Sequence, residues 1–126
     1  MRTHQLPQSA PKQSQIVTKA ALRAAERLEI KNTILARILG ISEPTISRMR
    51  KGTRELAPDQ KSFELAVLFV RLYRSLDGIV AGDDKVASDW LRNKNSVLNA
   101  IPLELIQTIS GLANVIEYLD SRRAIV

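Results

Sequence analysis

The chain has 126 residues, which is enough for one or two small domains, and it contains no cysteine. Disulfides, thiolate metal sites and cysteine nucleophiles are therefore excluded within it. The net charge of +6 is unevenly spread: residues 1–76 carry fourteen basic and six acidic side chains, whereas residues 77–126 carry five basic and seven acidic ones. A polyanionic partner is therefore expected to bind the first half only.

The polar segment 1–15 contains two prolines and too few apolar side chains to fold, so it is expected to be disordered. The only histidine, His4, lies in this segment and is expected to be solvated rather than a metal ligand or general base. The apolar run at 65–70 is far shorter than the roughly 20 residues of a membrane span. No signal peptide is recognisable, so the expected location is the cytoplasm.

Two helices are predicted before residue 40. Apolar residues recur at every fourth position over 16–29, which is typical of an amphipathic helix. Asn32 is a candidate N-cap for a second helix over 33–39. Gly40 is expected to end that helix, because glycine readily adopts a positive φ angle.

A third helix is predicted directly after this turn. Ser42 is its candidate N-cap, and Glu43 and Pro44 follow in the first turn, where the missing N–H of proline costs no hydrogen bond. The helix is expected to run to about Lys51 and to be stopped by Gly52.

Helices are also predicted throughout the second half, with no clear strand, so the expected fold class is all-α. A fourth helix over about 58–77 starts at a proline and is apolar on a wide arc, which is typical of a helix packed on two sides. Its second side is expected to meet either a partner subunit or the C-terminal half. Gly78 and Gly82 are expected to mark a break after this helix. The remaining predicted elements are a helix over about 84–92 capped by Asp83 or Asp84, an asparagine-rich loop over 93–99, a helix over about 102–107 beginning with Pro102, and a helix over about 109–121 capped by Thr108.

The segment NTILARILGISEPTISRMRKG, at 32–52, has the pattern of a helix-turn-helix. Ala36 is small where the two helices must approach, and Ile41 is placed to fill the turn. Ile46 and Met49, three positions apart, are expected to hold the second helix against the first. The remaining face of the second helix is polar and basic, which suits insertion into a DNA groove.

A recognition helix places its N-terminal residues against base edges in the major groove, and neighbouring polar and basic residues hold the phosphates. The alternative interpretation is a helical hairpin with ordinary solvated charge. Spacing, glycine turn, capping serine and basic helix end together favour DNA binding. The expected base contacts are Glu43, Pro44, Ser47 and Arg48, and the expected phosphate contacts are Asn32, Thr45, Arg50, Lys51 and Arg54.

The match LARILGISEPTISRMRKG is fairly specific, and over about residues 16–76 the sequence resembles the Xre/lambda-repressor-like helix-turn-helix family. Members of that family usually bind inverted repeats as dimers. The resemblance therefore implies a homodimer that binds operator DNA.

Residues 77–126 contain no catalytic constellation. Asp83, Asp84 and Asp89 lack the alternating spacing and terminal glutamate of a calcium loop, and helix capping explains the first two. The serines have no general base near them in sequence. Trp90, the only tryptophan, is expected to lie in the core, and the alternative is a hot spot on an interaction surface. The protein is thus predicted not to be an enzyme and to bind no metal, cofactor or small-molecule substrate.

The stretch WLRNKNSVLNAIPLELIQTISGLANVIEYL, at 90–119, resembles the C-terminal domain of antitoxins of the Xre/MbcA/ParS type. Two features depart from the family pattern. The small, glycine-rich turn before the proline is replaced by residues 99–101, Asn-Ala-Ile, and the chain ends in RRAIV. The residues that carry the resemblance are Trp90, Leu91, Asn95, Leu98, Pro102, Leu103, Glu104, Leu105, Thr108, Gly111 and Val115.

This resemblance implies the antitoxin of a type II toxin–antitoxin system. Toxins of the family have a RES domain, resemble ADP-ribosyl-transferase folds and deplete NAD. The antitoxin's C-terminal half covers the entrance of the toxin's active site, and the complex represses its own operon. The expected toxin-binding residues are Asn93, Asn95, Tyr118, Arg122, Arg123, Ala124, Ile125 and Val126.

The expected organisation is therefore a disordered segment over 1–15, a DNA-binding and dimerisation domain over 16–76, and a small helical toxin-binding domain over 77–126. The alternative function is a free-standing repressor of the Xre family, whose C-terminal half dimerises or senses a ligand. A set of polar groups converging on apolar walls would favour that alternative, and the sequence shows no such set.

Overall fold

The computed structural model describes residues 12–124, and within them the chain forms seven helices and no strand, as predicted for an all-α fold. No helix in that range is long and apolar enough to cross a membrane. The helices are α1 (Gln13–Arg27), α2 (Asn32–Leu39), α3 (Glu43–Lys51), α4 (Lys61–Ile79), α5 (Asp84–Arg92), α6 (Pro102–Leu105) and α7 (Ile109–Ala124).

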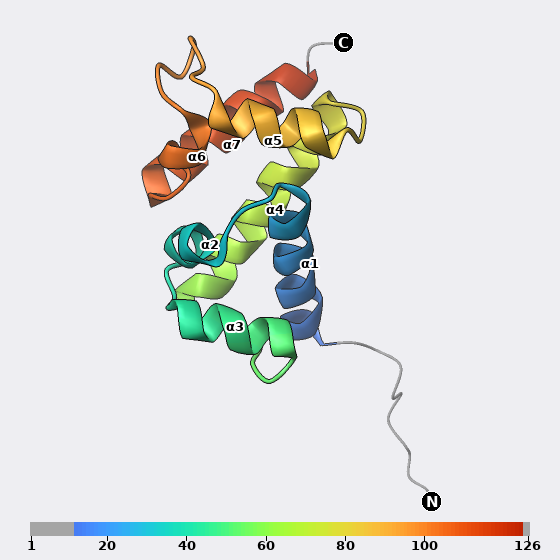
Figure 1. Cartoon of the computed structure of the whole chain (residues 1–126), viewed down its shortest axis with the longest axis vertical. Coiled ribbons are helices and arrows are strands. Elements are labelled where there is room, and N and C mark those ends of the chain that lie inside the picture. Colours follow the sequence, from blue (N-terminus) through green and yellow to red (C-terminus); the bar gives the residue numbers. More distant parts are fainter. Residues whose placement is uncertain (1–11, 125–126) are drawn as a thin grey trace, which may run out of the picture.

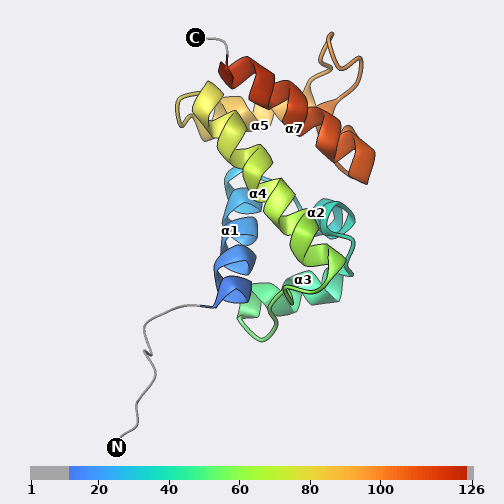
Figure 2. The same cartoon turned by 180° about the vertical axis from the view of Figure 1, so that it is seen from behind.

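Helix α4 is the central element of the structure (Figures 1 and 2). It packs against α1 and α2 along its first part and against α7 along its second part. Phe69, Leu72 and Leu76 of α4 are fully buried. The second side of its wide apolar arc is thus covered by the C-terminal half of the same chain.

Helix α1 begins three residues earlier than predicted, so residues 13–15 are helical rather than disordered. The N–H of Ile16 donates to the carbonyl of Lys12 at 3.0 Å. The N–H groups at the start of the apolar face are thus bonded to carbonyls of the preceding turn, which is helical for that reason. The remainder of the segment predicted to be disordered, including His4, lies outside the described residues.

The predicted start of α4 at Pro58 is wrong, because residues 57–60 form a tight turn. The N–H of Gln60 donates to the carbonyl of Ala57 at 3.0 Å, which places Pro58 at the second position of a β-turn. The predicted break at Gly78 is also displaced. Helix α4 continues through it to Ile79, and the positive φ angles follow at Ala81 and Gly82 (54° and 80°).

Several predicted helix ends are confirmed. Gly40 and Gly52 end α2 and α3 with φ angles of 69° and 80°. Ser42 Oγ accepts from the N–H of Thr45 at 3.2 Å, and the Asp83 carboxylate accepts from the N–H of Val86 at 3.2 Å. Helix lengths are less well predicted: α1 ends at Arg27 rather than residue 29, α6 stops at Leu105 rather than residue 107, and α7 continues to Ala124 rather than residue 121.

Candidate functional site

The segment α2–turn–α3 has the packing that its sequence pattern predicts. Ile46 is fully buried and Met49 is 3% exposed, so this side of α3 is held against the body of the protein. Ala36 is buried at the close approach, and Ile41 in the turn packs against the core. The opposite side of α3 is consequently presented outward from one end of the molecule (Figure 1).

A shallow groove runs along this outward side of α3. It combines a carboxylate, a proline ring, a hydroxyl group and two basic side chains of α3 with an amide at the start of α2, so it offers both donors and acceptors. Six of the nine predicted DNA-binding residues therefore lie together in it. The residues that line the groove are Asn32, Glu43, Pro44, Ser47, Arg48 and Lys51.

Asn32 does not cap α2, contrary to the sequence-based prediction. Lys31 occupies the N-cap position with extended backbone, and Asn32 is the first helical residue. The Asn32 side-chain oxygen instead accepts a hydrogen bond from Arg50 Nε at 2.8 Å. The charged guanidinium is the stronger partner for that oxygen, and the bond ties the end of α3 to the start of α2.

The three remaining residues of the predicted set do not line the groove. Arg50 lines a neighbouring hollow with residues of α1, and Arg54 is exposed beyond the end of α3. The Thr45 hydroxyl lies 2.8 Å from Ser42 Oγ and belongs to the capping arrangement. Of these three, Arg50 and Arg54 keep a cationic group at the surface.

The structure adds two basic residues that the sequence reasoning did not assign to the site. Lys19 and Arg23 of α1 line a hollow together with Arg50 of α3. The Arg50–Asn32 hydrogen bond joins this hollow to the groove on α3. The sequence pattern places Lys19 and Arg23 on the outward face of the first helix. Their proximity to α3 depends on how α1 packs relative to α3, which the pattern does not give.

In the C-terminal half, the two asparagines of the predicted toxin-binding set stabilise the 93–101 loop. Asn93 Nδ2 donates to the carbonyl of Asp89 at 2.9 Å, at the end of α5. Asn95 Oδ1 accepts from the N–H groups of Val97 and Leu98, both at 2.9 Å, and the backbone of Asn95 pairs with Ala100. Both side chains are thus engaged in shaping the loop.

Trp90 is half-buried and packs against the edge of the core, so its predicted core role is met in part. Its ring is stacked on that of Tyr118, with centroids 6.3 Å apart and planes inclined by 10°. Arg122 Nη1 donates to the Tyr118 hydroxyl at 2.8 Å, and Arg122 Cζ lies 5.8 Å from the centroid of the Tyr118 ring. Leu91, one position later, fills the core position instead and is fully buried.

Arg123 is directed to the other side of α7. Its Nη1 donates to Ser75 Oγ at 3.3 Å, and Ser75 donates to Asp120 at 2.8 Å. Asp120 also pairs with Arg71. The hydrogen bond from Ser75 and the charge of Arg71 hold the pKa of Asp120 below its usual value. These contacts fasten the end of α7 to α4. The side chain of Ala124 lies outside the described part of the structure, and so do Ile125 and Val126.

Arg92 joins the two halves of the chain. Its Nη1 donates to the carbonyl of Leu28 at 3.1 Å, and its Nη2 donates to the carbonyl of Glu29 at 2.6 Å. The same guanidinium also binds the carbonyl and hydroxyl oxygens of Ser88. Arg92 therefore satisfies backbone acceptors where α1 ends, a role that no pattern in the sequence indicated.

Comparison with known families matches two regions of the chain. The antitoxin Xre-like helix-turn-helix domain matches residues 8–71, and the antitoxin Xre/MbcA/ParS C-terminal toxin-binding domain matches residues 75–124. The chain belongs to the Xre-like antitoxin family. No curated protein sequence matches it significantly.

The antitoxin thus combines a helix-turn-helix domain with a toxin-binding domain, and its partners are DNA and a toxin. The two matched regions meet within one continuous helix, since α4 runs from Lys61 to Ile79. Its first part belongs to the helix-turn-helix match, and its end belongs to the toxin-binding match. Within residues 12–124, no group of three histidine, cysteine or acidic side chains could hold a metal ion.

Proposed function

We propose that this antitoxin blocks the active site of a RES-domain, NAD-degrading toxin and represses its own operon as a homodimer. Its DNA-binding domain spans residues 16–76 and its toxin-binding domain spans residues 77–126. The observation that carries the proposal is the arrangement of the antitoxin's two matched regions. The outward side of α3 lies at one end of the molecule, and α5 and α7 lie at the other end (Figure 1).

Repression is assigned to the groove on α3. Arg48 offers the forked donor that pairs with guanine, and Glu43 offers an acceptor for cytosine. Pro44 and Ser47 lie against the bases beside them. The phosphates are held by the remaining predicted residues, which are Asn32, Thr45, Arg50, Lys51 and Arg54.

Homodimerisation is assigned to the groove between α1 and α4. Two large apolar side chains at this groove are exposed to solvent: Ile16 is 52% exposed and Val67 is 43% exposed. Three further apolar side chains line the same groove, and so do polar side chains of α4 and α7. The apolar ones are Val17, Ala20 and Val70, and the polar ones are Arg71, Arg74, Ser75, Asp120 and Arg123. A second copy seated there would cover this apolar surface and place two α3 helices for an inverted repeat.

Neutralisation is assigned to the C-terminal half together with the end of the chain. Tyr118 and Arg122 are presented between α5 and α7, and the asparagine-stabilised loop follows α5 in the chain. Arg123 and residues 124–126 follow at the end of α7. We propose that this end reaches toward the nucleotide cleft of the toxin, because arginine binds carboxylates and phosphates strongly.

The decisive experiment is co-expression of the antitoxin with the toxin encoded by the adjacent reading frame, in the cytoplasm of a bacterial host. Cell growth and cellular NAD are followed, and a tag on the antitoxin is used to recover the partner. We expect restored growth, restored NAD and a co-purifying toxin. Growth arrest without a co-purifying partner would contradict the proposal and favour a free-standing repressor.

Deletion of residues 121–126 tests the role of the chain end. The truncated antitoxin is expected to bind operator DNA normally but to lose protection against the toxin. Full protection by the truncated form would show that the end of the chain is not needed to block the active site.

A further inference from the structure

The stacked side chains of Trp90, Tyr118 and Arg122 form a continuous column across two helices. Trp90 comes from α5, and Tyr118 and Arg122 come from successive turns of α7. The two rings are nearly parallel, and Arg122 is fixed to the hydroxyl end of Tyr118 by a 2.8 Å hydrogen bond. The column therefore links α5 to α7 through side chains and holds an arginine at its end.

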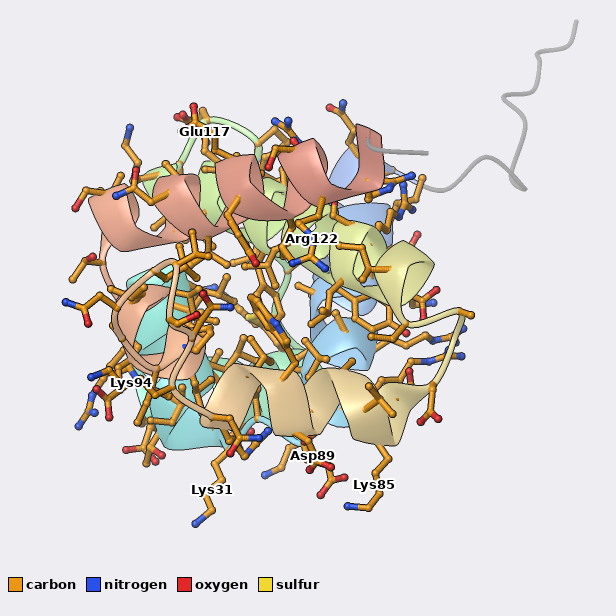
Figure 3. All side chains as sticks on the ribbon, turned by 90° about the horizontal axis from the view of Figure 1, so that it is seen from above. Lys31, Lys85, Asp89, Lys94, Glu117 and Arg122 are labelled. Carbon is orange, nitrogen blue, oxygen red and sulfur yellow. The ribbon has the colours of Figure 1, made fainter. Side chains whose placement is uncertain are left out.

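This column lies at the end of the molecule that faces away from α3. In Figure 3, which looks onto that end, Arg122 projects from α7 into the space between α7 and α5. The labelled Glu117 on α7 and Lys85 and Asp89 on α5 point outward from the two opposite edges. The charged side chains thus form a rim, and the aromatic column lies inside it.

The two rings of the column pack against the edge of the core and leave part of their surface exposed. The interior of this half is already filled by side chains that are at most 1% exposed, among them Leu91, Leu112 and Leu119. Trp90 and Tyr118 are only half-buried, and Arg122 is exposed. Val86, one turn before Trp90 on α5, is 48% exposed and extends the apolar surface.

The chemistry of the column is that of an interface anchor. Tryptophan, tyrosine and arginine are the residues most enriched among those that dominate binding energy at protein interfaces. The rings are held rigidly by stacking, so binding costs them little conformational entropy. Arg122 forms no ion pair within residues 12–124, and its guanidinium keeps N–H groups available for an acidic partner.

We propose that the Trp90–Tyr118–Arg122 column is the central anchor for the toxin. The partner is taken to be the toxin because the column lies wholly within the residues matched by the toxin-binding domain. The complementary surface expected on the toxin is an apolar slot that takes the edges of the two rings. A carboxylate at one end of the slot would pair with Arg122. The inference rests on the proposed function and adds Trp90, and the stacked surface between α5 and α7, to the chain end that the proposed function assigns to the toxin.

Lys31 provides a control outside the toxin-binding match, which covers residues 75–124. It is exposed at the start of α2 and points outward, away from the column, in Figure 3. A charge reversal at either residue changes the net charge equally. Only the reversal at Arg122 places a carboxylate beside Tyr118.

The test measures toxin affinity of the full-length antitoxin and of two variants by calorimetry with purified toxin. Arg122→Glu is expected to weaken binding about tenfold or more, as loss of a central interface arginine does. Lys31→Glu is expected to change the affinity by less than about threefold, because Lys31 lies outside the residues matched by the toxin-binding domain. Thermal melts followed by circular dichroism establish that both variants are folded.

A second readout observes Trp90 directly. Because Trp90 is the only tryptophan of the chain, incorporation of 5-fluorotryptophan gives one ¹⁹F resonance. We expect saturating unlabelled toxin to shift this resonance and to remove its sensitivity to the H₂O/D₂O ratio. Operator DNA should leave it unchanged.

The outcomes separate this inference from the proposed function. A toxin complex that forms while the resonance is unmoved, or equal loss of affinity in both charge reversals, would overturn the column as the anchor and leave the antitoxin's role in place. Failure of the unaltered antitoxin to bind the toxin at all would overturn both.

Discussion

Gly111 sits where α6 and α7 approach each other most closely. A Cβ atom at this position would overlap the carbonyl group of Leu105 and lie 2.8 Å from Thr108 Oγ1. The Thr108 hydroxyl also accepts from the N–H of Gly111 at 3.1 Å, which caps α7. The closeness of the two backbones therefore requires glycine here.

We predict that Gly111→Ala lowers the free energy of unfolding by about 1–3 kcal/mol, because the added methyl meets rigid backbone. The matched control is Gly78→Ala, where the nearest atom is Nε of the flexible Arg123 side chain at 3.4 Å. Since alanine is the better helix former by about 0.5–1 kcal/mol, that variant should be as stable as the original chain or slightly more so. Urea unfolding followed by circular dichroism measures both, and equal effects would contradict the prediction.

Arg48 and Lys51 line the same groove but are expected to act differently on DNA. Arg48→Ala should relax the preference at one base pair by about 1–3 kcal/mol, because a forked donor to guanine is lost. Lys51→Ala should weaken binding to all sequences alike and reduce the salt slope by about one unit. Competition binding to a panel of operator variants at several salt concentrations separates the two. An unchanged rank order of operators for Arg48→Ala would show that Arg48 does not contact bases.

Among the helices, α5 is fastened to the first half of the chain through Arg92. The guanidinium donates to the carbonyls of Leu28 and Glu29, which directly follow α1, and to Ser88 on its own helix. Hydrogen bonds of this kind, from a charged donor, each stabilise a fold by about 1.5–3 kcal/mol.

Arg92→Met is therefore predicted to lower the free energy of unfolding by about 2 kcal/mol, since the apolar chain is kept but the donors are lost. Arg92→Lys keeps the charge without the forked geometry and should recover only part of the loss. Denaturant titration is the measurement. An unchanged unfolding midpoint for Arg92→Met would mean that water replaces these contacts without cost.

The ends of individual helices could be predicted from the sequence where a single residue determines where the helix starts or stops. Gly40, Ser42 and Asp83 act on their own backbone neighbours, so their roles could be predicted from sequence. Pro58 could not be placed, because proline suits both a helix start and the second position of a turn. Asn32, Trp90 and Arg92 take their roles from side chains or backbone far along the chain. Their partners become known only once the helices are packed, and the same holds for the Lys19–Arg23 extension of the basic surface.

At the scale of the whole molecule, the exposed Ile16 and Val67 lead to a prediction about oligomeric state. Replacing both by aspartate should convert the proposed homodimer to a monomer, because two carboxylates would lose their hydration and the apolar contact would be lost. Val97→Asp is the control, since Val97 is 70% exposed but lies on the 93–101 loop, outside this groove. Light scattering coupled to size exclusion measures the mass. A double variant that stays dimeric would place the interface elsewhere.

Helix α4 runs through both matched regions and has 19 residues, which corresponds to a rod of roughly 28 Å. Its far end carries α5 and α7, so a toxin held there would stand off the duplex by about the length of that rod. We expect bound toxin to change the affinity of the antitoxin for DNA. The length of DNA that the antitoxin protects at each half-site should stay the same. Hydroxyl-radical footprints recorded with and without toxin should have the same edges at every half-site. The antitoxin would then act as a spacer that keeps the bound toxin away from the promoter DNA and leaves it accessible to a second antitoxin at the neighbouring site.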